Sequence, residues 1–362
     1  MTVRLYRSTD TSAPSLTGVA GTLTSLLDAI LVNGYGSQTA AGWTIAYTGT
    51  NKRVYTMASG GTGYSIYVDD SAPGTGGGRE ARVSGWTTPT GLGAGSGQFP
   101  TPAQMAAPSG ALVIRKSATA DATARAWTVV ADGHTFYLFS ETGDFTSPFC
   151  AYPFMFGDFF TYGSTDANNC MIIGRTLENN ANAGVAAGFS QASMVDAFGS
   201  IAYCNSTGLS NTLPGHFIAS NYTGVGGSVP AGKHVDIAKM GGQQAGALGP
   251  MQMGFLGIWT TGSQGTGTSW TSEFNYPNSP DSGLYVSPVW IHHNGFVRGY
   301  LKGLWAPLQN HPIAHNDTYS GTGVMSGKSL LAQDIIGLSN CWNSGPIVGA
   351  AQVHIETSDT WS

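Results

Sequence analysis

Residues 126–139 read Ala-Trp-Thr-Val-Val-Ala-Asp-Gly-His-Thr-Phe-Tyr-Leu-Phe, and they carry the strongest β-hairpin signal in the chain. Two runs rich in β-branched and aromatic residues flank Asp132-Gly133, and such runs are typical of strands. Asp-Gly supplies the positive φ angles of a type I′ turn, whose twist suits a pair of antiparallel strands. The sequence therefore predicts a hairpin over 126–139 within a β-rich fold.

Similar short runs lie on both sides of this hairpin. They cover residues 43–48, 53–57, 64–69, 112–116, 154–162, 171–175, 284–292, 296–301 and 351–357. Glycine, which separates many of them, makes up 52 of the 362 residues, about twice the ordinary share. We therefore expect a mainly β chain, with antiparallel sheets in a sandwich or barrel-like arrangement, one amphipathic N-terminal helix and long glycine-rich loops.

The predicted helix covers residues 22–33. Thr22 can cap its start, and Gly34 can end it in the left-handed conformation. The apolar side chains fall on one face of a 3.6-residue period, and they are Leu23, Leu26, Leu27, Ile30 and Leu31. This face either packs on the chain's own sheet or contacts another subunit. For the second case, the predicted assembly contacts are Leu23, Leu27, Ile30 and Leu31.

The chain has no internal repeat of fixed period and no break in composition that would mark a linker. Periodicity weakens after the first half, apart from a short helix expected over 189–198. We therefore divide the chain into an N-terminal region of helix and antiparallel β structure, 1–177, and a loop-rich β region, 178–362. The alternative is one continuous domain.

The low charge of the chain excludes several classes of protein. Charged residues are 10% of the chain, with 15 Lys and Arg against 20 Asp and Glu. A disordered chain needs high charge and few aromatics, and a duplex nucleic-acid binder needs a clustered basic surface. No apolar stretch is long enough to span a membrane, and the N-terminus lacks the layout of a signal peptide. We expect no nucleic-acid partner and no membrane insertion.

The sequence offers no convincing metal or cofactor site. Its four cysteines lack a C-x-x-C pair, so free thiols are expected; they are Cys150, Cys170, Cys204 and Cys341. His311 and His315 have a spacing that holds zinc on a helix, but Pro312 between them argues against a helix. His292 and His293 are adjacent, so in a strand they point to opposite faces. We expect no metal and no cofactor.

Catalytic motifs are also lacking, since neither a G-x-S-x-G elbow nor a phosphate-binding G-x-x-x-x-G-K-[ST] loop occurs. A glycosidase would need two carboxyl groups flanking a sugar, and the candidates are Asp69, Asp70, Asp144, Asp158 and Asp166. Most of these lie in predicted turns, where Asp hydrogen-bonds the backbone. We therefore expect a chain that is not an enzyme.

Aromatic side chains on long loops are candidate sugar contacts. Trp259, Trp270 and Tyr276 lie in the loop-rich region, and exposed rings there can stack on sugars. Large aromatic side chains are more often core or subunit contacts, so this interpretation stands beside ordinary packing.

The sequence resembles a family of tailed-bacteriophage virion structural proteins, described as structural or tail proteins. The similar pieces near the start are residues 1–10, Ala13-Pro14, Leu16-Thr17-Gly18, the helix over 23–32, Asn33-Gly34-Tyr35-Gly36, Ala41-Gly42-Trp43 and Thr50-Asn51-Lys52. The later pieces are Tyr67-Val68-Asp69-Asp70, Arg79-Glu80-Ala81-Arg82, Arg115-Lys116-Ser117-Ala118, Phe136-Tyr137-Leu138, Phe156-Gly157-Asp158, Gly232-Lys233-His234 and residues 355–361. None of these pieces is a catalytic motif.

The resemblance implies a structural subunit of a virion and does not indicate which part. Together with the low charge and many aromatic residues, it leads us to expect the tail, baseplate or neck, where the chain would hold neighbouring subunits or fibres. The expected partners are other virion proteins and further copies of the chain, assembled in the host bacterial cytoplasm. The alternatives are a receptor- or glycan-binding tail protein, a head decoration protein and, last, a glycosidase.

Overall fold

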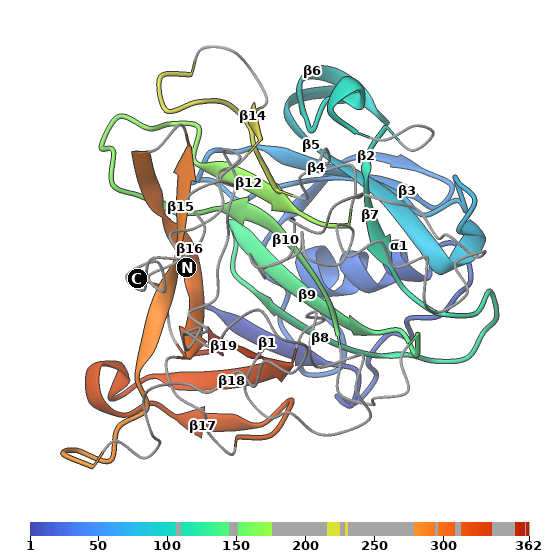
Figure 1. Cartoon of the computed structure of the whole chain (residues 1–362). Coiled ribbons are helices and arrows are strands. Elements are labelled where there is room, and N and C mark those ends of the chain that lie inside the picture. The colour runs from blue at the N-terminus through green and yellow to red at the C-terminus, as the bar shows by residue number, and fades with distance from the viewer. Residues whose placement is uncertain are drawn as a thin grey trace, which may run out of the picture.

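The structure is a computed structural model that describes residues 1–105, 110–144, 151–175, 216–224, 229–230, 279–293, 296–307, 313–334, 352–358 and 360–361. Strands dominate these residues and pair into antiparallel sheets (Figure 1). The mainly β architecture expected from the sequence is therefore confirmed.

The described strands form three sheets. The central sheet runs in the order β1 (Arg4–Arg7), β8 (Ala126–Ala131), β9 (Thr135–Glu141), β10 (Tyr152–Asp158), β12 (Cys170–Ile173), β13 (His216–Ile218) and β14 (Val229–Pro230). The second sheet runs β2 (Thr44–Gly49), β3 (Lys52–Thr56), β4 (Ser65–Asp69), β5 (Glu80–Gly91) and β6 (Ala94–Phe99), with β7 (Leu112–Arg115) paired to β5. The third runs β11 (Phe160–Thr161), β16 (Phe296–Pro307), β19 (Gln352–Glu356), β18 (Ser329–Asp334) and β17 (Thr318–Ser320), with β15 (Val286–His293) paired to β16.

The central sheet is buried on both faces, because the other two sheets cover it from opposite sides. Successive side chains of a strand point to opposite faces. In β9, Phe136 and Leu138 join the core shared with the second sheet, whereas Tyr137 and Phe139 join the core shared with the third sheet. The hairpin 126–139 therefore contributes to both cores, which explains why nearly all of its residues are buried.

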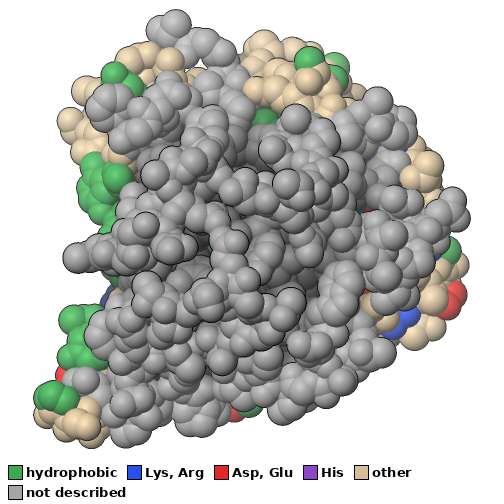
Figure 2. Space-filling view, viewed as in Figure 1, with side chains coloured by type: hydrophobic (Ala, Val, Ile, Leu, Met, Phe, Trp, Pro, Cys, Tyr) green, Lys and Arg blue, Asp and Glu red, His purple; other side chains and the backbone are tan. Residues whose placement is uncertain are grey.

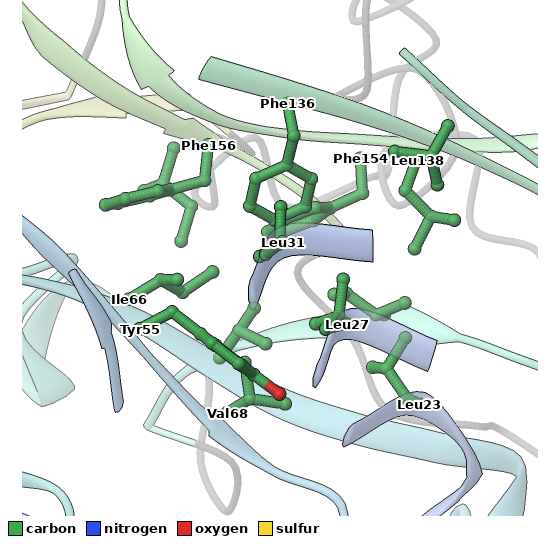
Figure 3. Close-up of a cluster of buried hydrophobic side chains, with 14 of the residues drawn as sticks. Leu23, Leu27, Leu31, Tyr55, Ile66, Val68, Phe136, Leu138, Phe154 and Phe156 are labelled. Atoms are coloured by element: carbon green, nitrogen blue, oxygen red, sulfur yellow. The ribbon is translucent and has the colours of Figure 1, made fainter. Parts of the chain in front are cut away.

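Helix α1 (Thr22–Leu27) continues into a π-helical turn, Asp28–Asn33. Figure 3 shows its leucines between Tyr55, Ile66 and Val68 of the second sheet and the phenylalanines of the central sheet. All four predicted assembly contacts have no exposed surface, and they are Leu23, Leu27, Ile30 and Leu31. The helix therefore packs on the chain's own sheets, and this face is not available to another subunit.

The start of α1 differs from the prediction. Gly21 precedes the helix with φ 87°, and Thr22 makes no side-chain cap hydrogen bond. Instead, Asp70, which directly follows β4, accepts a hydrogen bond from the Leu23 N–H at 2.8 Å. A carboxylate distant in the sequence thus satisfies a free amide at the start of the helix.

The hairpin is confirmed, but its turn is not type I′. Ala131 pairs with Phe136, so Gly133 and His134 occupy the turn, and neither has the positive φ angle that a type I′ turn requires. The Asp132 carboxylate accepts hydrogen bonds from the N–H groups of His134 and Thr135, both at 2.8 Å. This side-chain contact stabilises a different turn.

In the short 3₁₀ turn Pro102–Gln104, Thr101 and Gln104 form a capping box and Pro102 occupies the first position. Two further short turns are Gly77–Arg79 and Gly323–Met325. The helix expected over 189–198 lies outside the described residues.

Strands from both predicted regions pair with each other. In the central sheet, β12 pairs with β13, and in the third sheet, β11 pairs with β16. The core between these two sheets likewise combines Tyr137 and Met155 with Leu304 and Ile355. Residues on both sides of position 177 therefore belong to the same sheets.

We expect Leu27→Ala to lower the free energy of unfolding by about 2–5 kcal/mol, because it removes a fully buried side chain and leaves a cavity. Urea denaturation of the isolated chain measures this change. Val324→Ala is the control, since Val324 is 73% exposed and should change stability by less than about 0.5 kcal/mol. Equal effects of the two substitutions would contradict the core position of Leu27.

Candidate interaction surface

Three aromatic side chains form an exposed cluster on the third sheet, and they are termed the aromatic ladder. Phe160 and Tyr300 are register partners on β11 and β16, and their rings stack with centroids 4.7 Å apart. Tyr162 lies 5.7 Å from Phe160 and 6.0 Å from Tyr300. Phe160 is 38% exposed and Tyr162 is 57% exposed. Such a group of large rings at the surface is typical of an interaction site.

A fourth aromatic residue, on another strand, adjoins the ladder. Trp290 of β15 is the register partner of Tyr300 and is partly exposed, and opposite residues of an antiparallel pair share a face. Val297 on β16 is exposed as well. Figure 2 shows hydrophobic side chains along the left edge of the molecule, on the side where β15 and β16 lie in Figure 1.

The alternation of β16 explains the outward position of the ladder. Leu301, the neighbour of Tyr300 on β16, is fully buried in the core against the central sheet, so Tyr300 faces away from that core. Gly299 is required for the pairing with β11, because a Cβ there would lie 1.6 Å from the Phe160 carbonyl oxygen. The short β11 can therefore approach β16 and place Phe160 against Tyr300.

A buried ion pair holds the segments beneath the ladder. Arg298 of β16 donates to both carboxylate oxygens of Asp166, with the shorter bonds at 2.7 Å, and also to the Ser220 carbonyl oxygen at 2.7 Å. The side chains of Arg298 and Asp166 are 3% and 2% exposed. The Tyr162 N–H donates to the Arg298 carbonyl oxygen at 2.8 Å. Bidentate pairs of this kind fix geometry, so the ladder stands on a rigid base.

The geometry of the rings indicates which class of partner fits. A sugar platform presents an open ring face, but Phe160 and Tyr300 stack on each other at an interplanar angle of 27°. This stacking covers one face of each ring, and the Tyr162 ring stands nearly perpendicular to Phe160, at 81°. Burying such rings against another protein is favourable, and aromatic residues are enriched at protein interfaces. The ladder therefore suits a protein contact better than a sugar contact.

The five carboxylates considered for glycoside hydrolysis each have a structural partner. Asp69 pairs with Lys52, Asp70 with Lys116, Asp144 with Arg115 and Asp166 with Arg298, while Asp158 accepts hydrogen bonds from Thr62. Burial raises the pKa of Asp158, although the bonds from Thr62 oppose this shift. The described geometry does not bring two of these carboxylates together across an open cleft.

Asp144 belongs to a buried network of charges. Arg115 donates to both of its carboxylate oxygens, at 2.7 and 2.9 Å, and also pairs with Glu80 at 3.1 Å. Arg175 is the second partner of Glu80, at 3.0 Å. Burial would raise the pKa of Asp144, but the hydrogen bonds and charge of Arg115 outweigh burial and hold the pKa below its ordinary value.

His315 lies in a hydrogen-bonded cluster. His315 Nε2 lies 3.1 Å from Glu141, and His315 Nδ1 accepts the Asp334 N–H at 2.9 Å. That backbone bond leaves Nε2 as the ring donor. His311 lies outside the described residues, as do the side chains of His292 and His293.

In the described part of the chain, no group of three or more His, Cys, Asp or Glu side chains is arranged to hold a metal ion. Cys170 is a buried free thiol, whereas Cys150, Cys204 and Cys341 lie outside the described residues. Burial raises the pKa of the Cys170 thiol well above its usual range, which keeps it protonated and unreactive.

The predicted sugar contacts Trp259, Trp270 and Tyr276 lie outside the described residues. The aromatic ladder was not predicted from the sequence. Its only local signal is the alternation of Phe160 and Tyr162 in the run 154–162, and that alternation does not indicate which face of a strand is exposed. Tyr300 lies far away in the chain and joins them only through strand pairing.

No model of a known protein family matches the sequence, and no curated protein sequence matches it. Within the described residues, none of the helical segments has the length and apolarity needed to cross a membrane.

We expect Asp144→Asn to reduce the acid sensitivity of folding. The pKa of the Asp144 carboxyl is lower in the folded chain than in the unfolded chain. The ionised carboxylate therefore stabilises the folded chain at pH values above the unfolded pKa, and this stabilisation is lost as the pH falls through the folded pKa. The urea midpoint of the wild type should therefore fall more than that of Asp144→Asn between about pH 7 and about pH 3.

The control for this comparison is Asp317→Asn, since Asp317 is exposed in the turn before β17. This substitution should leave the pH dependence of the urea midpoint unchanged. An unchanged pH dependence in Asp144→Asn would mean that the pair with Arg115 does not stabilise the folded chain.

Proposed function

We propose that this chain is a structural subunit of a tailed-phage virion, located in the tail, baseplate or neck, where it holds neighbouring subunits or fibres. The observation that carries the proposal is the aromatic ladder, an exposed apolar surface on a rigid sheet. The resemblance of the sequence to phage structural proteins over most of its length supports the virion as the location.

The composition of the ladder fits a protein interface. Tyr and other aromatic residues are enriched at interfaces, while charged residues are depleted from interface cores. The three ladder residues and the adjoining Trp290 carry no charge, and only 10% of the whole chain is charged. Burial of these rings in an assembly would remove apolar surface from water.

The proposal includes the partners and the activity. The partners are other virion proteins or further copies of the chain, gathered during assembly in the host bacterial cytoplasm, with no nucleic acid bound and no insertion into a membrane. The role is structural and not enzymatic, which agrees with the structural partner that each candidate carboxylate has.

The copy number of the chain in purified particles tests this location. Quantitative mass spectrometry against the portal and capsid proteins should give about 6 to 24 copies per particle, as expected for a closed ring in a tail or neck. Hundreds of copies would place the chain on the head surface instead. Absence from particles would overturn the virion assignment.

A second measurement tests the ladder itself. We expect the double substitution Tyr162→Ser and Tyr300→Ser to lower incorporation of the chain into particles at least tenfold, since losing about 1.4 kcal/mol of binding free energy has that effect. Incorporation is measured by complementing a phage that lacks the gene.

Tyr222→Ser is the matched control, because Tyr222 is also 57% exposed but lies outside the ladder. It should leave incorporation unchanged. Normal incorporation of the double variant would show that the ladder is not an assembly contact.

Retention of both variants on host cell-wall polysaccharide would instead favour the glycan-binding alternative, with Trp259, Trp270 and Tyr276 as its candidate contacts.

A further inference from the structure

A lysine and an aspartate lie in contact where two strands of the second sheet end, beside the start of α1. Asp70 directly follows β4 and Lys116 directly follows β7, and both strands pair with β5. Lys116 Nζ contacts Asp70 Oδ1, and both side chains have no exposed surface. Two fully desolvated charges of this kind are costly to bury even when they are paired.

We propose that Lys116 and Asp70 condense into an isopeptide bond that the folded chain forms without another protein. The bond would join Lys116 Nζ to Asp70 Cγ and release one water molecule. It is independent of the proposed role in a virion, since it concerns only the folded chain.

Both oxygens of Asp70 are held in positions that suit this step. Oδ1 contacts the attacking nitrogen, while Oδ2 accepts hydrogen bonds from the N–H groups of Leu23 at 2.8 Å and Thr24 at 3.4 Å. Backbone N–H groups aimed at an oxygen stabilise the negative charge that develops there when a carbonyl carbon is attacked. Oδ2 would therefore become the amide oxygen, and Oδ1 would leave.

The nitrogen is fixed from its other side. Lys116 Nζ donates to the Val19 carbonyl oxygen at 2.8 Å and lies 3.4 Å from Thr22 Oγ1. The uncharged amine would attack Cγ of the protonated acid, one N–H proton would pass to the departing hydroxyl, and that oxygen would leave as water. The product amide keeps one N–H for Val19 and its oxygen for Leu23 and Thr24, so its polar atoms remain paired.

The surroundings favour the uncharged forms that react. Burial raises the pKa of Asp70 even though the charge of Lys116 opposes this shift. Burial likewise lowers the pKa of Lys116 against the charge of Asp70. A desolvated lysine is an activated nucleophile, and condensation replaces two buried charges with one neutral amide.

The adjacent pair provides a matched comparison within the same chain. Lys52 Nζ lies 2.9 Å from Asp69 Oδ2, but the lysine side chain is 34% exposed and the aspartate side chain 12% exposed. Water stabilises the charged forms of such a pair. Lys52 and Asp69 should therefore remain an ion pair.

The test is intact-mass spectrometry of the purified full-length chain under denaturing conditions, followed by tryptic mapping. The wild-type mass should be lower than that of the sequence by one water. Trypsin does not cleave after an acylated lysine, so the map should contain residues 54–79 joined to residues 116–125. Lys116→Arg should have the full mass of its sequence, and Asp70→Asn should lose one ammonia in place of the water.

Each outcome decides the proposal, because the wild-type mass does not depend on how the variants fold. The full mass in the wild type would overturn it and leave Lys116 and Asp70 as an ion pair. A loss of water that persists in Lys116→Arg, with dehydration mapped to Asp132-Gly133 and no branched peptide, would also overturn it, because this would be succinimide formation. A branch between Lys52 and Asp69 would contradict the argument from burial.

Discussion

The central sheet has two apolar faces, and the rest of the structure depends on covering both of them. The strands β8, β9 and β10 send alternate side chains in opposite directions, so Phe136 and Leu138 need one cover and Tyr137 and Phe139 need another. Exposing either face to water would cost the hydrophobic free energy of a whole core. The second sheet with α1 covers one face and the third sheet covers the other.

Helix α1 fills the space between two sheets that do not pack directly on each other at this place (Figure 3). Its leucines contact both sheets, and its first free amides are held by Asp70, which also contacts Lys116. One buried aspartate thus connects the helix, the end of β4 and the end of β7. This arrangement places charged groups where apolar side chains would ordinarily pack, which is why their chemistry is of interest.

The third sheet has a core face and an outward face, and the outward face carries the aromatic ladder. Leu301 and Leu304 pack inward, while Tyr300 points outward and stacks on Phe160. The buried pair of Arg298 and Asp166 fixes the strands below them. A surface that is apolar and rigid loses little conformational entropy when a partner binds, and this is the physical reason for proposing it as an assembly contact.

The sequence by itself determined the local elements: the strand runs, the hairpin at 126–139 and the single-face period of the helix, because each depends on neighbours within a few residues. It did not determine the turn of the hairpin, where the Asp132 side chain selects another geometry. Only the tertiary structure decided that the apolar helix face is internal, that Asp70 caps the helix, and that Phe160 meets Tyr300. Asp70 lies 47 positions from Leu23, and Phe160 lies about 140 positions from Tyr300. Local periodicity carries no information about contacts over such separations.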